Sequence, residues 1–257
     1  MTRGARVMSI QNLTIGLPAP RPLSLQETAL FLDLDGTLAP IAARPQDVRP
    51  DPRRTSLLER LARKLDGRLA VVSGRTLADV DRILEGCVSA VAAVHGLVRR
   101  SSERRVFEAR PHPALGRAAE GFRAFAARDS GLIVEEKDGL SVALHFRLAG
   151  SHAEAARACA RGLAADTGLA LQEGDMVEEL RTPGASKGDA VRNFMALAPF
   201  AGAQPVFVGD DATDEDGFAA AQALGGLGIA VGAARPTLAG FRLAGVEAAL
   251  AWLEASL

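Results

Sequence analysis

Short apolar runs alternate with amphipathic stretches along most of this chain. Five largely apolar runs lie at residues 29–32, 69–72, 88–94, 205–208 and 227–231. They lack polar–apolar alternation, which is typical of strands that are buried on both faces of a parallel sheet. Because helical patterns separate them, we predict an α/β fold with a Rossmann-like parallel sheet and right-handed crossovers.

The segment between the first two runs illustrates the helical pattern. Leu57, Leu61 and Leu65 recur at a spacing that places them on one face of a helix. Thr55 precedes this stripe and is the expected N-cap, while Gly67 follows it and is the expected stop.

The middle of the chain departs from this alternation. Apolar and polar residues at 132–136 and 140–147 flank Lys137-Asp138-Gly139, a pattern that indicates two antiparallel strands joined by a tight turn. Helical patterns accompany them, so we predict a small α+β cap inserted into the parallel core. The predicted division is a flexible N-terminal arm at 1–28, a core at 29–106 and 180–257, and a cap at 107–179.

Composition narrows the possible partners. The 257 residues carry a formal net charge of −1, which argues against non-specific binding to nucleic acid or to a membrane surface. Two cysteines are too few for a disulfide scaffold or a four-cysteine zinc site. We find neither a signal-peptide pattern nor an apolar run of about 18 residues. We therefore expect a cytoplasmic protein, and we also expect a monomer or weak oligomer.

Two acidic residues directly follow the first apolar run. Asp33 and Asp35 lie in the string DLDGTL, at the expected carboxyl end of a buried strand. Open α/β sheets bind their ligands at that edge. Crowded carboxylates are costly there unless a cation or a proton balances them, although a solvated acidic loop is an alternative interpretation.

A second acidic string, GDDATDED at residues 209–216, follows another apolar run and contains five acids. Hard oxygen ligands suit Mg²⁺, which also binds phosphate. Acids also favour a helix N-terminus, so the alternative is a purely structural role. We expect both, with Asp210 facing a metal ion and Glu215 and Asp216 beginning a helix.

Two further strings contain groups that could hold a phosphoryl oxygen. Ser73-Gly74-Arg75 follows the second apolar run, and Ser186-Lys187-Gly188 begins a predicted helix. Each string alone fits an ordinary turn or a surface lysine. Together with the two acidic strings, in this chain order, they favour a phosphate site.

In this order the four strings resemble the motifs of the haloacid-dehalogenase (HAD) phosphatase superfamily. The resemblance implies that Asp33 is a nucleophile that forms an aspartyl-phosphate and that Asp35 is the general acid and base. It implies an Mg²⁺ ion bound by Asp33, the Asp35 carbonyl and Asp210, with Asp211 and Asp214 just behind these ligands. The implied phosphate-binding residues are Thr37, Ser73, Gly74 and Lys187, of which Ser73 and Lys187 also assist catalysis.

A closer resemblance is to the trehalose-6-phosphate phosphatase family. It rests on GDDATDED, on EEK at 135–137, on HFR at 145–147, on ELR at 179–181 with Lys187-Gly188, and on His95-Gly96. It implies Mg²⁺-dependent release of trehalose and phosphate from trehalose 6-phosphate. The residues that it implies for sugar binding are His95, Glu135, Lys137, Arg147 and Glu179.

Three alternatives remain open. The chain could be a HAD phosphatase for another phosphosugar, such as sucrose phosphate or mannosyl-phosphoglycerate. It could be a phosphomutase that keeps its phosphoenzyme, or a non-catalytic regulatory partner of a sugar synthase.

Overall fold

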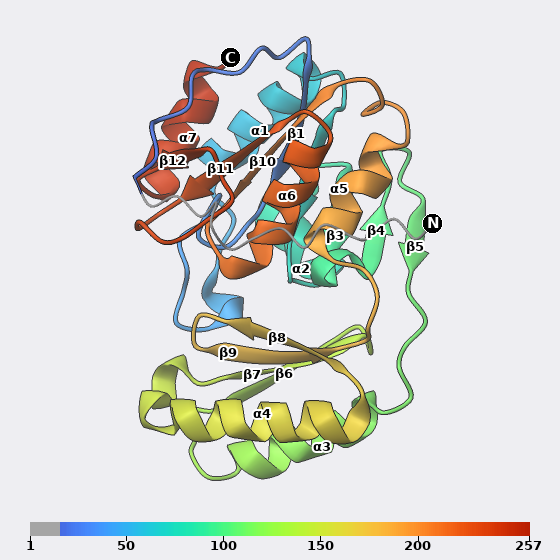
Figure 1. Cartoon of the computed structure of the whole chain (residues 1–257), viewed down its shortest axis with the longest axis vertical. Helices are drawn as coiled ribbons and strands as arrows, with labels where there is room; N and C mark the ends of the chain where they lie inside the picture. The colour runs from blue at the N-terminus through green and yellow to red at the C-terminus, as the bar shows by residue number, and fades with distance from the viewer. Residues whose placement is uncertain (1–15) are drawn as a thin grey trace, which may run out of the picture.

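The computed structural model describes residues 16–257, which form a larger core above a smaller cap (Figure 1). The core contains an eight-stranded sheet with the strand order β12-β11-β10-β1-β2-β3-β4-β5. Its strands are β1 (Thr28–Leu32), β2 (Leu69–Val72), β3 (Ala90–Ala93), β4 (Val98–Arg100), β5 (Val106–Glu108), β10 (Gln204–Gly209), β11 (Leu227–Val231) and β12 (Phe241–Leu243).

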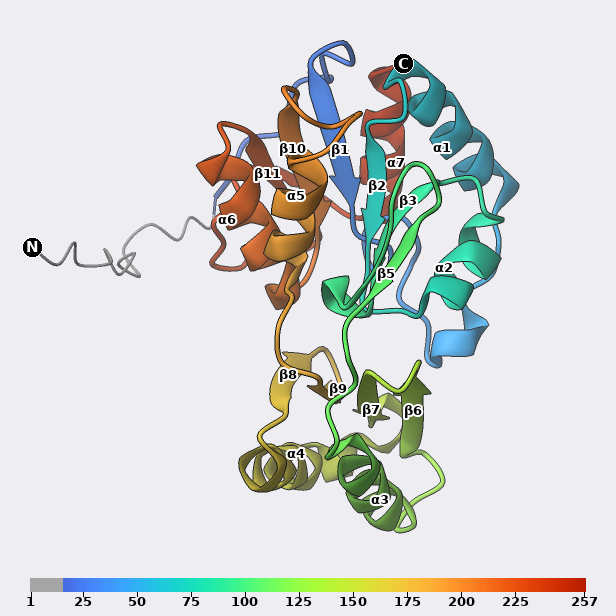
Figure 2. The same ribbon diagram turned by 90° about the vertical axis from the view of Figure 1, so that its right-hand side faces the viewer.

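The six strands from β12 to β3 pair in parallel, so the predicted parallel sheet is confirmed. All residues of β1 are buried, in keeping with its uninterrupted apolar sequence. Helices cover both faces of the sheet, as Figure 2 shows for α1 and α2 on one side and α5 and α6 on the other. The core helices are α1 (Pro52–Lys64), α2 (Leu77–Leu84), α5 (Lys187–Met195), α6 (Glu215–Ala223) and α7 (Val246–Ala255).

Helix α1 begins earlier than we predicted. The side chain of Asp51 accepts hydrogen bonds from the N–H groups of Arg53 and Arg54, and Pro52 occupies the first helical position. An aspartate N-cap followed by proline is a stronger start signal than Thr55, which lies inside the helix and donates its hydroxyl to Glu85. The prediction of Thr55 as the N-cap was therefore wrong.

The cap is a four-stranded antiparallel sheet with the order β6-β7-β9-β8. Its two helices lie on the face away from the core (Figure 1). The cap elements are β6 (Ile133–Lys137), β7 (Ser141–His145), β8 (Ala170–Gly174), β9 (Val177–Arg181), α3 (Leu115–Ala126) and α4 (Ala153–Thr167).

Alternation along the cap strands decides which residues face the core. Val134, Val142, Leu144 and Leu180 pack with the cap helices in a separate apolar cluster. Their neighbours on each strand must point to the opposite face, toward the core. Polar residues at alternate positions of β6 and β9 are therefore placed over the carboxyl edge of the parallel sheet.

The bounds of the predicted cap, residues 107 and 179, fall inside the strands β5 and β9. β5 ends at Glu108 within the core sheet, and β9 continues to Arg181 within the cap sheet. The sequence pattern did not indicate β4, β5 or β12, which are only three residues long each. We retain as a proposal that core and cap are separate structural units.

The described part of the predicted N-terminal arm, residues 16–28, contacts the core. The Trp252 indole N–H donates to the Arg21 carbonyl at 2.9 Å, and the Leu23 N–H donates to the Ser256 hydroxyl at 3.0 Å. Leu25 is buried against the core because its apolar side chain gains more there than in water. The remainder of the predicted arm lies outside the described residues. Within residues 16–257, no helix is both long and apolar enough to cross a bilayer.

Candidate active site

A cavity of about 670 Å³ lies between the carboxyl edge of the core sheet and the cap sheet. Most residues that the sequence singled out line it, although they come from distant parts of the chain. Those residues are Asp33, Asp35, Ser73, Gly74, His95, Glu135, Lys137, Arg147, Glu179, Lys187, Asp210 and Asp211.

Lys187 joins two acids at the floor of this cavity. Ser186 caps α5 and so fixes the position of Lys187 at the first helical turn. The Lys187 ammonium lies 2.8 Å from Asp33 Oδ1 and 2.7 Å from Asp214 Oδ1, and all three side chains are buried. Burial lowers the pKa of Lys187, but the charges of Asp214 and Asp33 outweigh it and raise that pKa above its usual value.

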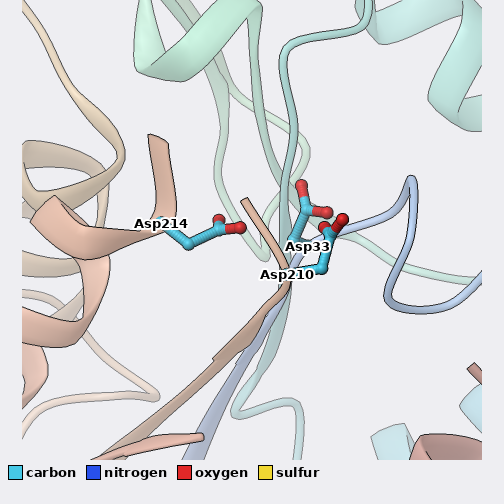
Figure 3. A group of neighbouring side chains, drawn as sticks. All are labelled: Asp33, Asp210 and Asp214. Atoms are coloured by element: carbon cyan, nitrogen blue, oxygen red, sulfur yellow. The ribbon is translucent and has the colours of Figure 1, made fainter. Parts of the chain in front are cut away.

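Asp33, Asp210 and Asp214 form an acidic group that one lysine cannot neutralise. Each offers a carboxylate oxygen, and these oxygens lie within 4.8 Å of one another (Figure 3). Burial raises the pKa of Asp33 well above its usual value, and the neighbouring acids add to the shift while Lys187 opposes it. Burial and the charge of Asp214 raise the pKa of Asp210 to about 7.

The donor set of this group suits a hard divalent cation. Both oxygens of Asp214 are already engaged, one with Lys187 and the other with the N–H of Asp211. Asp33 and Asp210, which lie side by side in Figure 3, are therefore the pair better placed to hold such a cation. Asp214 instead holds the lysine, a pairing that the sequence did not indicate.

The loop after β1 packs directly against Asp210. Gly36 adopts a φ of +78°, and a Cβ atom there would lie 2.0 Å from Asp210 Oδ2, so only glycine fits. Thr37 is fully buried and directs its hydroxyl to Asp210 Oδ1 at 3.4 Å. Thr37 thus lies behind the acidic group and does not line the cavity.

Asp35 is bound by Arg75 of the SGR string, a contact that the sequence did not indicate. The guanidinium donates from Nε to Asp35 Oδ2 at 2.6 Å and from Nη2 to Oδ1 at 2.7 Å. The Ser73 hydroxyl, which is also buried, accepts from the Arg75 N–H at 3.2 Å. Burial lowers the pKa of Arg75, but the bond to Asp35 outweighs it and the pKa is raised.

The cap contributes a second ionic group that reaches the core. Lys137 Nζ donates to Glu179 Oε2 at 2.5 Å and to the Gly74 carbonyl at 2.9 Å. His95 Nε2 lies 3.4 Å from the same Glu179 oxygen. A Cβ atom at Gly74 would lie 2.5 Å from His95 Nε2, so the glycine permits this ring to approach the loop.

Opposite charges shift the pKa values of Glu179 and Glu135 downward. Burial raises the pKa of Glu179, but Lys137 and His95 outweigh it and hold the carboxyl ionised. Burial also raises the pKa of Glu135, but a hydrogen bond from His145, at 2.7 Å, outweighs it. Burial lowers the pKa of His95, which Glu179 only partly opposes.

Arg147 lies farther along the cap and has its own partner. Its Nη2 donates to Asp175 Oδ2 at 2.8 Å and to the Asp175 carbonyl at 2.9 Å. It lines the same cavity, but it makes no hydrogen bond to the other predicted sugar-binding residues among those described. Asp211 caps the turn at residues 212–214 and so supports Asp214.

Comparison with known proteins agrees with this geometry. The family model described as trehalose-phosphatase matches residues 31–247. The trehalose-6-phosphate phosphatase of Escherichia coli (strain K12) is 38% identical over 228 residues, which are 88% of this chain and 85% of that protein.

Solved structures agree as well. A crystal structure of a trehalose-6-phosphate phosphatase related protein is 28% identical, with a TM-score of 0.73 over 88% of this chain and 95% of that one. A HAD phosphatase from Bacteroides thetaiotaomicron is 17% identical, with a TM-score of 0.59 over 89% of this chain and 94% of that one, and shares the fold. Both resemblances noted in the sequence are thereby confirmed. The chain belongs to the trehalose-phosphatase family, a family of phosphoric monoester hydrolases with the HAD fold.

Proposed function

We propose that this protein is an Mg²⁺-dependent phosphatase that hydrolyses trehalose 6-phosphate through an aspartyl-phosphate on Asp33. One observation carries the proposal. Asp33, Lys187 and Asp210 meet at the floor of a cavity whose roof is the cap, with Asp33 only 2.8 Å from Lys187. A phosphate on this floor leaves its attached sugar directed toward the cap.

Asp33, Asp210 and the main-chain carbonyl of Asp35 would hold the metal ion. When bound, Mg²⁺ supplies positive charge that offsets the repulsion between a carboxylate and a phosphate dianion. The raised pKa values of Asp33 and Asp210 support this assignment, because two ionised carboxylates this close require a cation.

The phosphoryl group transfers in two steps. An oxygen of Asp33 attacks phosphorus as the bond to the sugar oxygen breaks, and Asp35 gives its proton to that leaving oxygen. Lys187, the Ser73 hydroxyl and the Gly74 N–H group stabilise the charge on the transferring group. Asp35 then takes a proton from water, which attacks the acyl phosphate, releases phosphate and restores the Asp33 carboxylate.

The cap supplies sugar recognition and excludes water. Glu135, Lys137 and Glu179 face the cavity, and charged groups of this kind recognise paired hydroxyls well. A sugar that left any of them buried without a partner would bind more weakly, which is the physical basis of discrimination. Two bonds connect this group to the loop that carries Ser73 and Gly74: Lys137 donates to the Gly74 carbonyl, and the His95 backbone N–H donates to the Ser73 carbonyl.

The direct test compares phosphate release from trehalose 6-phosphate, sucrose 6-phosphate, mannosyl-phosphoglycerate and glucose 6-phosphate, with and without Mg²⁺. We expect the highest kcat/KM for trehalose 6-phosphate and no turnover after chelation. Faster turnover of another sugar would refute the substrate assignment. Transfer to a second sugar without free phosphate would indicate a mutase.

The covalent step needs a variant. Asp33→Asn should lower kcat by at least about 10⁴-fold, as expected for loss of a nucleophile, and should prevent acid-stable labelling of the protein by a phosphate donor. Asp66→Asn changes an exposed acid in the turn that follows α1 and is the matched control. Unchanged hydrolysis in Asp33→Asn would exclude the aspartyl-phosphate.

A further inference from the structure

Arg75 donates hydrogen bonds to both oxygens of the Asp35 carboxyl. Nε and Nη2 of Arg75 lie 2.6 and 2.7 Å from the two oxygens, and Nη1 donates to the Pro45 carbonyl at 2.9 Å. A planar guanidinium that contacts both oxygens fixes the plane of a carboxylate, which a single hydrogen bond does not.

The surroundings make this contact rigid. Arg75 is 8% exposed, and its contact with Pro45 leaves it little freedom to rotate. The Asp35 side chain retains 33% exposure, lines the cavity and has Arg75 as its hydrogen-bond partner among the described residues. One face of Asp35 is therefore held by protein while the other is open to a ligand.

Arg75 also lies at a junction of three elements. It follows β2 directly after Ser73 and Gly74, and it reaches across to the loop that follows β1. The carbonyl of the preceding Gly74 accepts a hydrogen bond from Lys137 of the cap. Asp35, the phosphate-binding loop and the cap are thus joined through two consecutive residues.

We propose that Arg75 is a positioning residue that aims Asp35 at the leaving oxygen of the substrate. This inference rests on the proposed acid and base role of Asp35. As the phosphorus–oxygen bond breaks, the leaving oxygen takes the proton of Asp35, and the transfer requires the two oxygens within hydrogen-bond distance. Without Arg75, the Asp35 side chain samples other rotamers and lies within hydrogen-bond distance of the leaving oxygen for only part of the time.

Leaving-group dependence distinguishes this role from a structural one. A poor leaving group such as a sugar alkoxide needs a proton, whereas 4-nitrophenolate leaves without one. We would measure kcat/KM for trehalose 6-phosphate and for a series of aryl phosphates from phenyl to 4-nitrophenyl phosphate. Because kcat/KM covers only the steps up to departure of the leaving group, the later hydrolysis of the phosphoenzyme does not mask the effect.

Arg75→Met should lower kcat/KM for trehalose 6-phosphate by about 100-fold, near the lower limit for loss of general acid catalysis, and affect 4-nitrophenyl phosphate much less. The dependence of rate on leaving-group basicity should steepen across the aryl series. Arg75→Lys should recover part of the loss, and Asp35→Asn with Arg75→Met should be no slower than Asp35→Asn alone.

Arg100→Met is the matched control. Arg100 is 5% exposed and holds both oxygens of Asp81 at 2.6 and 2.8 Å, away from the residues that line the cavity. Arg100→Met should show how the loss of a buried arginine–carboxylate pair changes thermal stability. It should leave the leaving-group dependence unchanged.

Two outcomes would overturn the inference. One is that Arg75→Met lowers kcat/KM equally for all leaving groups, and the other is that it has no effect. If the leaving-group dependence of Asp35→Asn is no steeper than that of wild type, the proposed acid role of Asp35 fails. If the dependence steepens in Asp35→Asn but stays at the wild-type value in Arg75→Met, only the role of Arg75 is refuted.

Discussion

The core and the cap each bury a group of carboxylates, and the two groups are balanced differently. In the core, Asp33, Asp210 and Asp214 share one cation, Lys187. Burial and mutual repulsion raise the pKa values of Asp33 and Asp210. The core group therefore has more negative charge than the protein alone can compensate.

In the cap, the two acids nearest the core each have a basic partner. Glu179 contacts Lys137 and His95, and Glu135 contacts His145. The pKa values of both acids are lowered even though burial alone would raise them. The difference shows that the core group needs a proton or an added cation to balance it. The cap group is already balanced in charge, although Glu179 Oε1 has no hydrogen-bond partner among the described residues.

The largest expected effect comes from removing the only lysine of the core group. Lys187→Met should lower the metal-free free energy of unfolding by about 3–5 kcal/mol, because it leaves buried acids without their cation. Urea denaturation measures this change. Lys64→Met, at an exposed position at the end of α1, should change the free energy by less than about 0.5 kcal/mol.

The excess of acid in the core also predicts a pH dependence. Because the folded protein holds a proton on Asp210 up to about pH 7, metal-free stability should fall as the pH rises from about 4 to about 7. The fall assigned to Asp210 should be on the order of 3 kcal/mol, since one pKa unit corresponds to about 1.4 kcal/mol and the group is partly exposed.

Denaturation of wild type and of Asp210→Asn across this pH range isolates that contribution. The variant should be the more stable of the two above pH 7 without metal, and it should gain little from Mg²⁺. Wild type should regain its stability when Mg²⁺ is added. Equal Mg²⁺ stabilisation of both proteins would contradict a metal site at Asp210.

A smaller effect is expected in the cap. Lys137→Met should lower the free energy of unfolding by about 2 kcal/mol. This is less than the cost of leaving a buried acid with no partner, because His95 remains beside Glu179. Mg²⁺ should not alter this cost, in contrast to the core variants. The kcat/KM for trehalose 6-phosphate should fall at least about tenfold while that for 4-nitrophenyl phosphate changes little. A matching loss with both substrates would argue that Lys137 acts on the phosphate loop rather than on the sugar.

The smallest effect is expected at Arg147. Its ion pair with Asp175 is partly exposed, with side chains 33% and 64% accessible. Arg147→Gln should therefore change the free energy of unfolding by less than about 1 kcal/mol. Its effect on kcat/KM for trehalose 6-phosphate should also be smaller than that of Lys137→Met. A larger effect would place the sugar at the far end of the cap.

The sequence by itself determined the parallel core and the convergence of the acidic strings. Asp33 and Asp210 each directly follow a buried strand, and the carboxyl ends of parallel strands meet at one edge. This inference needs only local patterns and the topology that they imply. The antiparallel hairpin of the cap followed in the same way from strand alternation around Lys137-Asp138-Gly139.

Only the tertiary structure decided which side chains pair. Three such pairs join residues that lie 40, 27 and 63 positions apart in the chain: Arg75 with Asp35, Lys187 with Asp214, and Lys137 with the Gly74 carbonyl. Local patterns likewise did not predict short edge strands such as β4 or the packing of residues 16–28 against the core. The physical reason is that periodicity reports which face a residue occupies, whereas the partner of a charged group depends on how distant segments pack against each other.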